Sequence, residues 1–166
     1  MISARGIKLT LLAWLAMIGF DLFLHGGLLS CLYQQDSPFL LSPDRAFTLI
    51  PVGYVSFLLL AVLLVWLMRR LGLKGWKSGT IFGLQIGMLI WGSLILGLLS
   101  ISTASLTLLF GWFVGQTLEL GLAGTVVGIG FTQERLRRLT LQVTGLIIVS
   151  IIVTIILQNT VFVSCP

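Results

Sequence analysis

Charged side chains are scarce in this sequence. Its 166 residues include ten Lys or Arg and five Asp or Glu, which together make 9% of the chain. An average soluble domain has about 25% charged residues, so these few cannot cover a water-facing surface. Because 57% of the residues are apolar and the mean hydropathy is +1.12, a soluble globular enzyme and a disordered segment are both excluded. The 19 glycines, 5 tryptophans and 10 phenylalanines are typical of a polytopic membrane protein.

Residue types that carry catalysis or bind metals are equally few. The single histidine excludes bis-histidine haem ligation and a His-rich metal site within one chain. The sequence contains no phosphate loop, CxxC, HExxH or nucleophile elbow. We therefore expect no enzymatic activity, no cofactor and no metal, although His25 could hold one chlorophyll magnesium or a haem shared with a partner chain. No basic stripe is interleaved with base-stacking aromatics, so nucleic acid is not an expected partner.

Long apolar segments dominate what is present. A helix needs about 20 mostly apolar residues to cross a bilayer. We therefore expect an all-α membrane protein, a compact bundle of five transmembrane helices in a single domain over residues 1–166. The first of these segments carries Asp21 and His25 and is longer than a signal-peptide core, so we expect it to be retained. The five segments are Leu9–Leu32, Thr48–Met68, Gly79–Ile101, Leu106–Phe131 and Leu139–Val163.

A separate helix signal precedes the second segment. Ser42, Pro43 and Asp44 have the N-cap, first-position proline and first-turn acid of a helix start. They predict a short interfacial helix over residues 43–49. Pro51 then interrupts that helix or opens the next one.

The distribution of basic residues predicts the orientation. Only Arg45 falls on one side of the predicted helices, and the other nine Lys and Arg residues fall on the opposite side. Because positive residues favour the cytoplasm, we expect a cytoplasmic N-terminus and an outer C-terminus in a bacterial inner membrane. Tyr33, Tyr54 and Trp112 are expected at the outer interface. The nine basic residues are Arg5, Lys8, Arg69, Arg70, Lys74, Lys77, Arg135, Arg137 and Arg138.

Glycine spacing predicts which helices pack closely. Small residues four apart lie on one helix face and allow backbones to approach. We expect internal packing at these glycines, with homodimerisation as the alternative. The last helix has no such face and is interrupted only by Ser150 and Thr154, so it is expected to face lipid or another membrane subunit. The glycine pairs and triplet are Gly79, Gly83 and Gly87; Gly111 and Gly115; and Gly124 and Gly128.

A few polar residues fall at membrane depth. Asp21 and His25 are four residues apart in the first segment, and Gln116 and Glu119 are three apart in the fourth. An ionised carboxylate there costs at least ~2.5–3.5 kcal/mol, so it must be protonated, paired or facing water. We expect these residues to form one intramembrane polar cluster, with Gln85 as a neutral partner. The cluster could join the helices, relay protons or cations, or use His25 as a ligand.

The stretch Asp21-x-x-x-His25-Gly26 resembles small bacterial membrane proteins of about four spans with no assigned activity. The resemblance covers the first four helices and implies only a compact helical bundle, with the fifth helix as an addition. It carries no functional residue over to this chain.

Two functions follow from these observations. The first is a non-catalytic accessory or scaffolding subunit that packs against a larger membrane complex, with lipid and other membrane subunits as partners. The second is a small proton-coupled transporter with a midplane Asp/His/Glu site between inverted repeats. A weak repeat supports the second, because Asp21 follows Trp14 by seven residues just as Glu119 follows Trp112.

The first testable prediction is a disulfide between Cys31 and Cys165, the only two cysteines. The expected topology places both on the outer side, which is oxidising in a bacterium, so the thiols should close. Unreduced, denatured protein should resist thiol alkylation and react at both cysteines after reduction. Labelling of both without reduction would contradict the bridge and indicate two unpaired small apolar residues.

Overall fold

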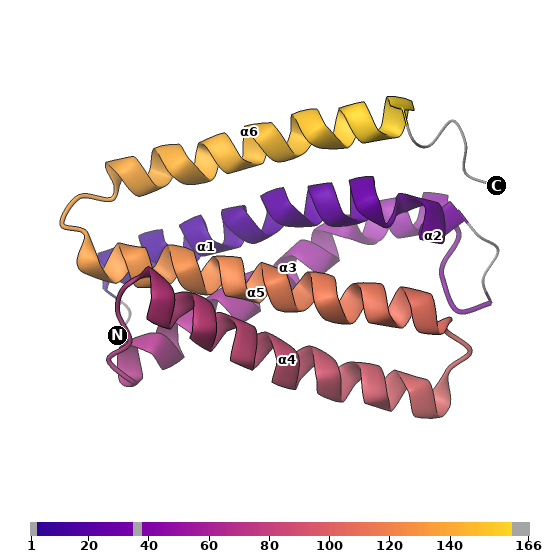
Figure 1. Cartoon of the computed structure of the whole chain (residues 1–166), viewed down its shortest axis with the longest axis horizontal. Helices are drawn as coiled ribbons and strands as arrows, with labels where there is room; N and C mark the ends of the chain where they lie inside the picture. The colour runs from indigo at the N-terminus through magenta and orange to yellow at the C-terminus, as the bar shows by residue number, and fades with distance from the viewer. Residues whose placement is uncertain (1–2, 35–37, 161–166) are drawn as a thin grey trace.

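The computed structural model describes residues 3–34 and 38–160, and within these ranges the chain is helical without strands. Figure 1 shows a bundle of long helices that run back and forth along one axis. The elements are α1 (Ala4–Phe23), a π-helical turn η1 (Leu24–Leu28), α2 (Ser30–Gln34), α3 (Pro43–Arg70), α4 (Trp76–Ile101), α5 (Leu106–Thr132) and α6 (Arg137–Thr160).

Five helices are long and apolar enough to cross a membrane, which confirms the all-α, five-helix expectation. They correspond to α1 with its π turn, α3, α4, α5 and α6. The separate interfacial helix predicted over residues 43–49 is wrong, because α3 continues without a break from Pro43 to Arg70. Pro51 removes only one backbone N–H from this helix and does not end it.

The first helix also departs from the expected single span over Leu9–Leu32. Its α-helical part ends at Phe23, and the Leu29 N–H donates to the Leu24 carbonyl five residues back, at 2.8 Å. This π-type bond adds one residue to the turn. The consecutive glycines Gly26 and Gly27 lie in this turn. Because glycine has a low helix propensity, departing from α-helical geometry costs little free energy here.

Helices α1 and α5 form the centre of the bundle and run antiparallel (Figure 1). Helix α4 packs along α5, α6 packs along α1, and α3 contacts both central helices. The core therefore combines one face from each of several helices, and many large side chains on the exposed faces are also apolar. Its most buried members include Leu9, Ala13, Met17, Leu64, Met68, Leu120, Val127 and Leu139.

Glycine brings the backbones of α4 and α5 into direct contact. A Cβ at Gly87 would lie 2.9 Å from Thr117 Cα, and a Cβ at Gly83 would overlap the Leu120 carbonyl. The same holds where Gly79 meets Gly124. The structure thus uses the Gly79, Gly83 and Gly87 face in packing within the chain.

The other predicted glycines also pack internally. Gly111 receives the Leu29 side chain, and Gly115 receives Leu24 from the π turn. A Cβ at Gly128 would meet the carbonyl of Gly75, whose N–H donates to the Gly128 carbonyl at 2.9 Å. Gly75 has φ = +87°, a conformation that favours glycine. This glycine allows the connection between α3 and α4 to pack against the end of α5.

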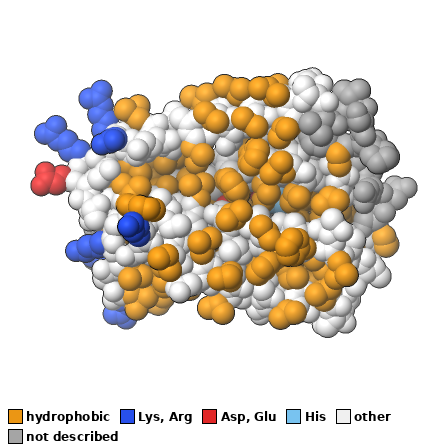
Figure 2. Space-filling view, in the orientation of Figure 1, with side chains coloured by type: hydrophobic (Ala, Val, Ile, Leu, Met, Phe, Trp, Pro, Cys, Tyr) orange, Lys and Arg blue, Asp and Glu red, His pale blue; other side chains and the backbone are white. Residues whose placement is uncertain are grey.

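The Lys and Arg side chains visible in Figure 2 gather at one end of the bundle, whereas Arg45 lies in the first turn of α3 at the other end. At the end where they gather, the Arg5 guanidinium donates to the Gly130 carbonyl at 2.7 Å and also to the Gln133 carbonyl. It thereby caps the carboxyl end of α5, where a cation is favoured by the helix dipole. We call this end, where α1, α4 and α6 begin and α3 and α5 end, the basic end.

The predicted disulfide lies outside the described residues, because Cys165 falls within 161–166. Cys31 lies in α2 at the end of the bundle opposite the basic end (Figure 1), and it is not a free cysteine.

The second prediction concerns the α4–α5 contact. Gly83→Ala should lower the free energy of unfolding by about 1–3 kcal/mol or more, because the added methyl must push two backbones apart. Gly97→Ala on the same helix is the matched control, since nothing lies within 4 Å of its Cβ position. The control should be neutral or stabilising by about 0.5–1 kcal/mol. Thermal unfolding in mild detergent measures both, and equal midpoints would contradict the contact.

Candidate functional site

A polar cluster forms at the end of α1, away from the basic end. Asp21 is in the last turn of α1, His25 is in the π turn, and Tyr33 is in α2. Trp112 and Gln116 face them from α5, where their four-residue spacing puts both on one side of the helix. Five side chains from four elements thus meet at one place.

Hydrogen bonds and close polar contacts connect these side chains into one network. The Trp112 Nε1–H donates to the Tyr33 hydroxyl at 2.5 Å, and that hydroxyl contacts His25 Nδ1. On the other side of the imidazole, His25 Nε2 lies 3.4 Å from Asp21 Oδ1 and 3.0 Å from the Gln116 amide. His25 therefore links a phenol on one side to a carboxyl on the other.

One protonation pattern is consistent with the contacts around His25. Tyr33 accepts from Trp112 and donates its own proton to His25 Nδ1, which leaves the imidazole proton on Nε2. That N–H then donates toward Asp21 Oδ1. Rotating the Gln116 amide presents Oε1, which otherwise has no partner among the described residues, to the same N–H.

Tyr33 keeps its proton in this arrangement. Burial raises the pKa of its phenol well above the ordinary value, and the nearby Asp21 carboxyl adds to that rise, while the bond from Trp112 opposes it. The phenol therefore stays neutral at physiological pH and remains a hydrogen-bond donor to His25.

The cluster lines a pocket of about 380 Å³ between α1, α3, α4 and α5, here named the Asp21 pocket. Its walls are largely aromatic, and no Lys or Arg of the described residues lines it. Trp91 also lines the pocket, and its Nε1–H is buried without a partner among the described residues. The aromatic lining residues are Tyr33, Tyr54, Phe57, Trp91 and Trp112.

Helix α6 fixes the π turn that carries His25. Thr154 Oγ1 donates to the Leu22 carbonyl at 3.1 Å, and Gln158 Nε2 donates to the Gly26 carbonyl at 2.9 Å. A Cβ at Gly26 would lie 3.2 Å from Thr154, so glycine lets α6 come this close. The last helix therefore has a buried polar stripe against α1, which the expectation of a lipid-facing helix omitted.

The structure places the predicted cluster residues in three different settings. Asp21, His25 and Gln116 come together in the network. Glu119 is fully buried one turn further along α5, and neither carboxyl oxygen has a hydrogen-bond partner among the described residues. Gln85 is exposed on α4, because it lies opposite the Gly83 and Gly87 face that packs on α5, so it does not join the cluster.

Tyr33, Trp91 and Trp112 belong to the site although the sequence did not assign them to it. Trp112 and Gln116 share a helix face, which is a signal that spacing alone carries. Tyr33 lies beyond the apolar span and reaches His25 only because the π turn redirects the chain.

No family model matches this chain, and no match was found among curated proteins or solved structures.

The third prediction tests the network. Tyr33→Phe removes the hydroxyl between Trp112 and His25 and leaves a buried N–H unpaired, which should cost about 1–3 kcal/mol of stability. Tyr54→Phe is the control, since its hydroxyl makes no hydrogen bond among the described residues although it lines the same pocket. Detergent unfolding midpoints measure both. A Tyr33→Phe midpoint equal to that of the control would show that the network does not stabilise the fold.

Proposed function

We propose that this chain is a multi-pass carrier that exchanges a small organic cation for a proton at the Asp21 pocket. The observation that carries the proposal is the pocket itself, which combines one carboxyl with a largely aromatic wall and lacks lining basic side chains. Aromatic faces attract cations through their quadrupole, most strongly for tryptophan. A carboxylate supplies the countercharge, so a cation with apolar groups matches both parts of the wall.

Proton coupling follows from the cost of an isolated charge. A carboxylate at membrane depth costs at least ~2.5–3.5 kcal/mol on insertion scales. Asp21 is therefore stable in two states, either protonated or ionised with a cation beside its carboxylate. An ionised Asp21 without a cation is disfavoured. When a cation enters, the Asp21 O–H bond breaks and the proton leaves, and when the cation departs a proton returns. The released proton goes to the surrounding solution, and the His25 Nε2–H, 3.4 Å from Asp21 Oδ1, is placed to donate to the carboxylate that remains.

Charge distribution supports an orientation for this carrier. With the basic end in the cytoplasm, as the positive-inside rule predicts, the Asp21 pocket opens toward the outer half of the bilayer. The carrier would then sit in a bacterial inner membrane with its N-terminus inside.

A second candidate is the accessory membrane subunit, favoured by the outer face of α6. From Ile148 to Ile156 the exposed side chains of α6 are all apolar, and the two polar residues in this stretch, Ser150 and Thr154, are buried. This face would suit another membrane helix as well as lipid. Size measurement in mild detergent separates the candidates, because a subunit co-purifies with large membrane proteins at fixed stoichiometry and a carrier migrates alone or as a homodimer. The exposed side chains are Ile148, Val149, Ile151, Ile152, Ile155 and Ile156.

The fourth prediction uses phenyltrimethylammonium as the probe and its neutral isostere tert-butylbenzene as the reference. The cation should quench tryptophan fluorescence saturably, because Trp91 and Trp112 line the pocket, and should release up to one proton per chain into weakly buffered solution. Asp21→Asn should abolish the release. The matched control Asp44→Asn, an exposed acid in the first turn of α3, should leave it unchanged.

Transport is tested in proteoliposomes. A pH gradient should drive uptake of the radiolabelled cation with wild-type and Asp44→Asn protein and fail to do so with Asp21→Asn. Equal binding of the neutral isostere, or gradient-driven uptake by Asp21→Asn, would reject the exchange mechanism.

A further inference from the structure

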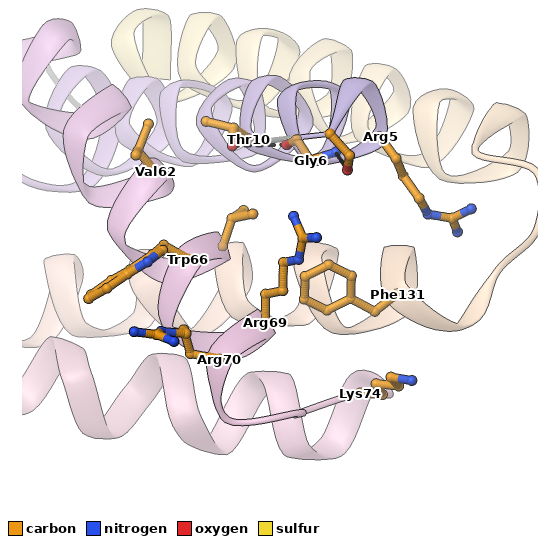
Figure 3. A pocket seen from close by; sticks show the side chains of 11 residues that line it. Arg5, Gly6, Thr10, Val62, Trp66, Arg69, Arg70, Lys74 and Phe131 are labelled. Atoms are coloured by element: carbon orange, nitrogen blue, oxygen red, sulfur yellow. Dashed lines mark hydrogen bonds between the residues drawn. The ribbon is translucent and has the colours of Figure 1, made fainter. Parts of the chain in front are cut away.

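A second and larger cavity lies at the basic end, between α1 and α3, and its volume is about 920 Å³. Figure 3 shows Gly6 and Thr10 on one wall and Val62 and Trp66 on the other. Phe131 closes it from α5. It shares no lining residue with the Asp21 pocket, so it is a separate site. We call it the basic groove.

Among the described residues, four cationic side chains and no carboxylate line the basic groove. Arg5 is occupied with the carbonyls at the end of α5. Arg70 lies over the Trp66 ring with its guanidinium carbon 6.0 Å from the ring centroid. In Figure 3, Arg69 extends from α3 toward α1, beside Phe131. Arg69, Arg70 and Lys74 form no ion pair among the described residues.

The acid expected to balance these charges lies elsewhere. Glu134 is the only acidic residue in the connections at the basic end, and it lines a different cavity with Arg5, Lys8 and Arg137. The basic groove thus holds Arg69, Arg70 and Lys74 without a carboxylate partner in the part of the chain that the structure describes. Like charges gathered without an anion repel one another, so the site favours a ligand that carries negative oxygens.

The groove is also apolar along its depth. Val62 lies seven residues before Arg69 on α3, which is roughly 10 Å along the helix axis. Val62, Val65 and Thr10 therefore line the part that extends into the bundle away from the charged rim. An inorganic anion would fill only the rim, whereas a ligand with a charged head and an apolar tail fits both parts.

We infer that the basic groove binds the phosphate group of an anionic phospholipid, with an acyl chain lying along Val62 and Val65. Arg69 and Lys74 would contact the phosphate oxygens, and Trp66 would sit at headgroup level, where tryptophan is favoured. This inference does not depend on the proposed exchange activity.

The fifth prediction tests the groove by native mass spectrometry of the full chain in detergent, titrated with dioleoyl phosphatidylglycerol. Arg69→Gln should weaken binding about fivefold or more, because one basic residue at a membrane surface contributes about 1 kcal/mol. Arg138→Gln is the matched control, since it removes a cation from the same end without touching the groove. Dioleoyl phosphatidylcholine should bind more weakly than phosphatidylglycerol, because its choline opposes the cations.

A second pair of variants distinguishes a lipid from a free phosphate. Val62→Phe should reduce phosphatidylglycerol binding by filling the groove, whereas Val52→Phe, exposed on the same helix far from it, should not. Millimolar inorganic phosphate should not displace the lipid. Equal losses with Arg69→Gln and Arg138→Gln would overturn the site in favour of general surface charge. If phosphate displaced phosphatidylglycerol and Val62→Phe left its binding unchanged, the lipid proposal would be rejected and the charged rim would be assigned to a soluble phosphate.

Discussion

The buried backbone polar groups of a helix need hydrogen-bond partners, and the candidate site lies where α1 no longer supplies all of them by itself. At Gly26 and Gly27 the α-helical pattern gives way to a π turn, and α6 side chains donate to two carbonyls around this turn. Side chains of α6 therefore stabilise the π turn. It directs His25 toward Tyr33 and α5, and it sends Leu24 into the space left by Gly115.

The close contact between α4 and α5 completes the pocket from the other side. Because Gly79, Gly83 and Gly87 carry no side chains, the α4 backbone rests directly on α5. Trp91, one turn beyond Gly87, reaches the same pocket as Trp112 on the neighbouring helix. Larger residues on this face would separate the helices and withdraw Trp91 from the polar cluster. Packing far from the network thus determines which aromatic groups a ligand would meet.

The number and type of the long helices were predictable from the sequence, because burying a backbone in hydrocarbon leaves few alternatives to a helix. Gln85 shows where that reasoning fails, since depth in a span does not specify which face a residue occupies. The spacing of Gly83 and Gly87 would have placed Gln85 on the opposite side. The polar stripe of α6 was also predictable from the sequence, because Ser150, Thr154 and Gln158 recur every four residues. The role of Tyr33 was not predictable from the sequence, since it depends on a π turn that tertiary contacts stabilise.

Helix α3 borders both cavities, although they lie toward opposite ends of the bundle. Tyr54 lines the Asp21 pocket, and Val62, two turns further along, lines the basic groove. Between the cavities the Trp14 Nε1–H donates to the Tyr54 carbonyl at 2.7 Å, which ties α3 to the central helix α1. The acidic pocket and the basic groove thus share one continuous helix, α3, and the Trp14–Tyr54 bond fixes the position of that helix beside α1, even though no side chain belongs to both cavities.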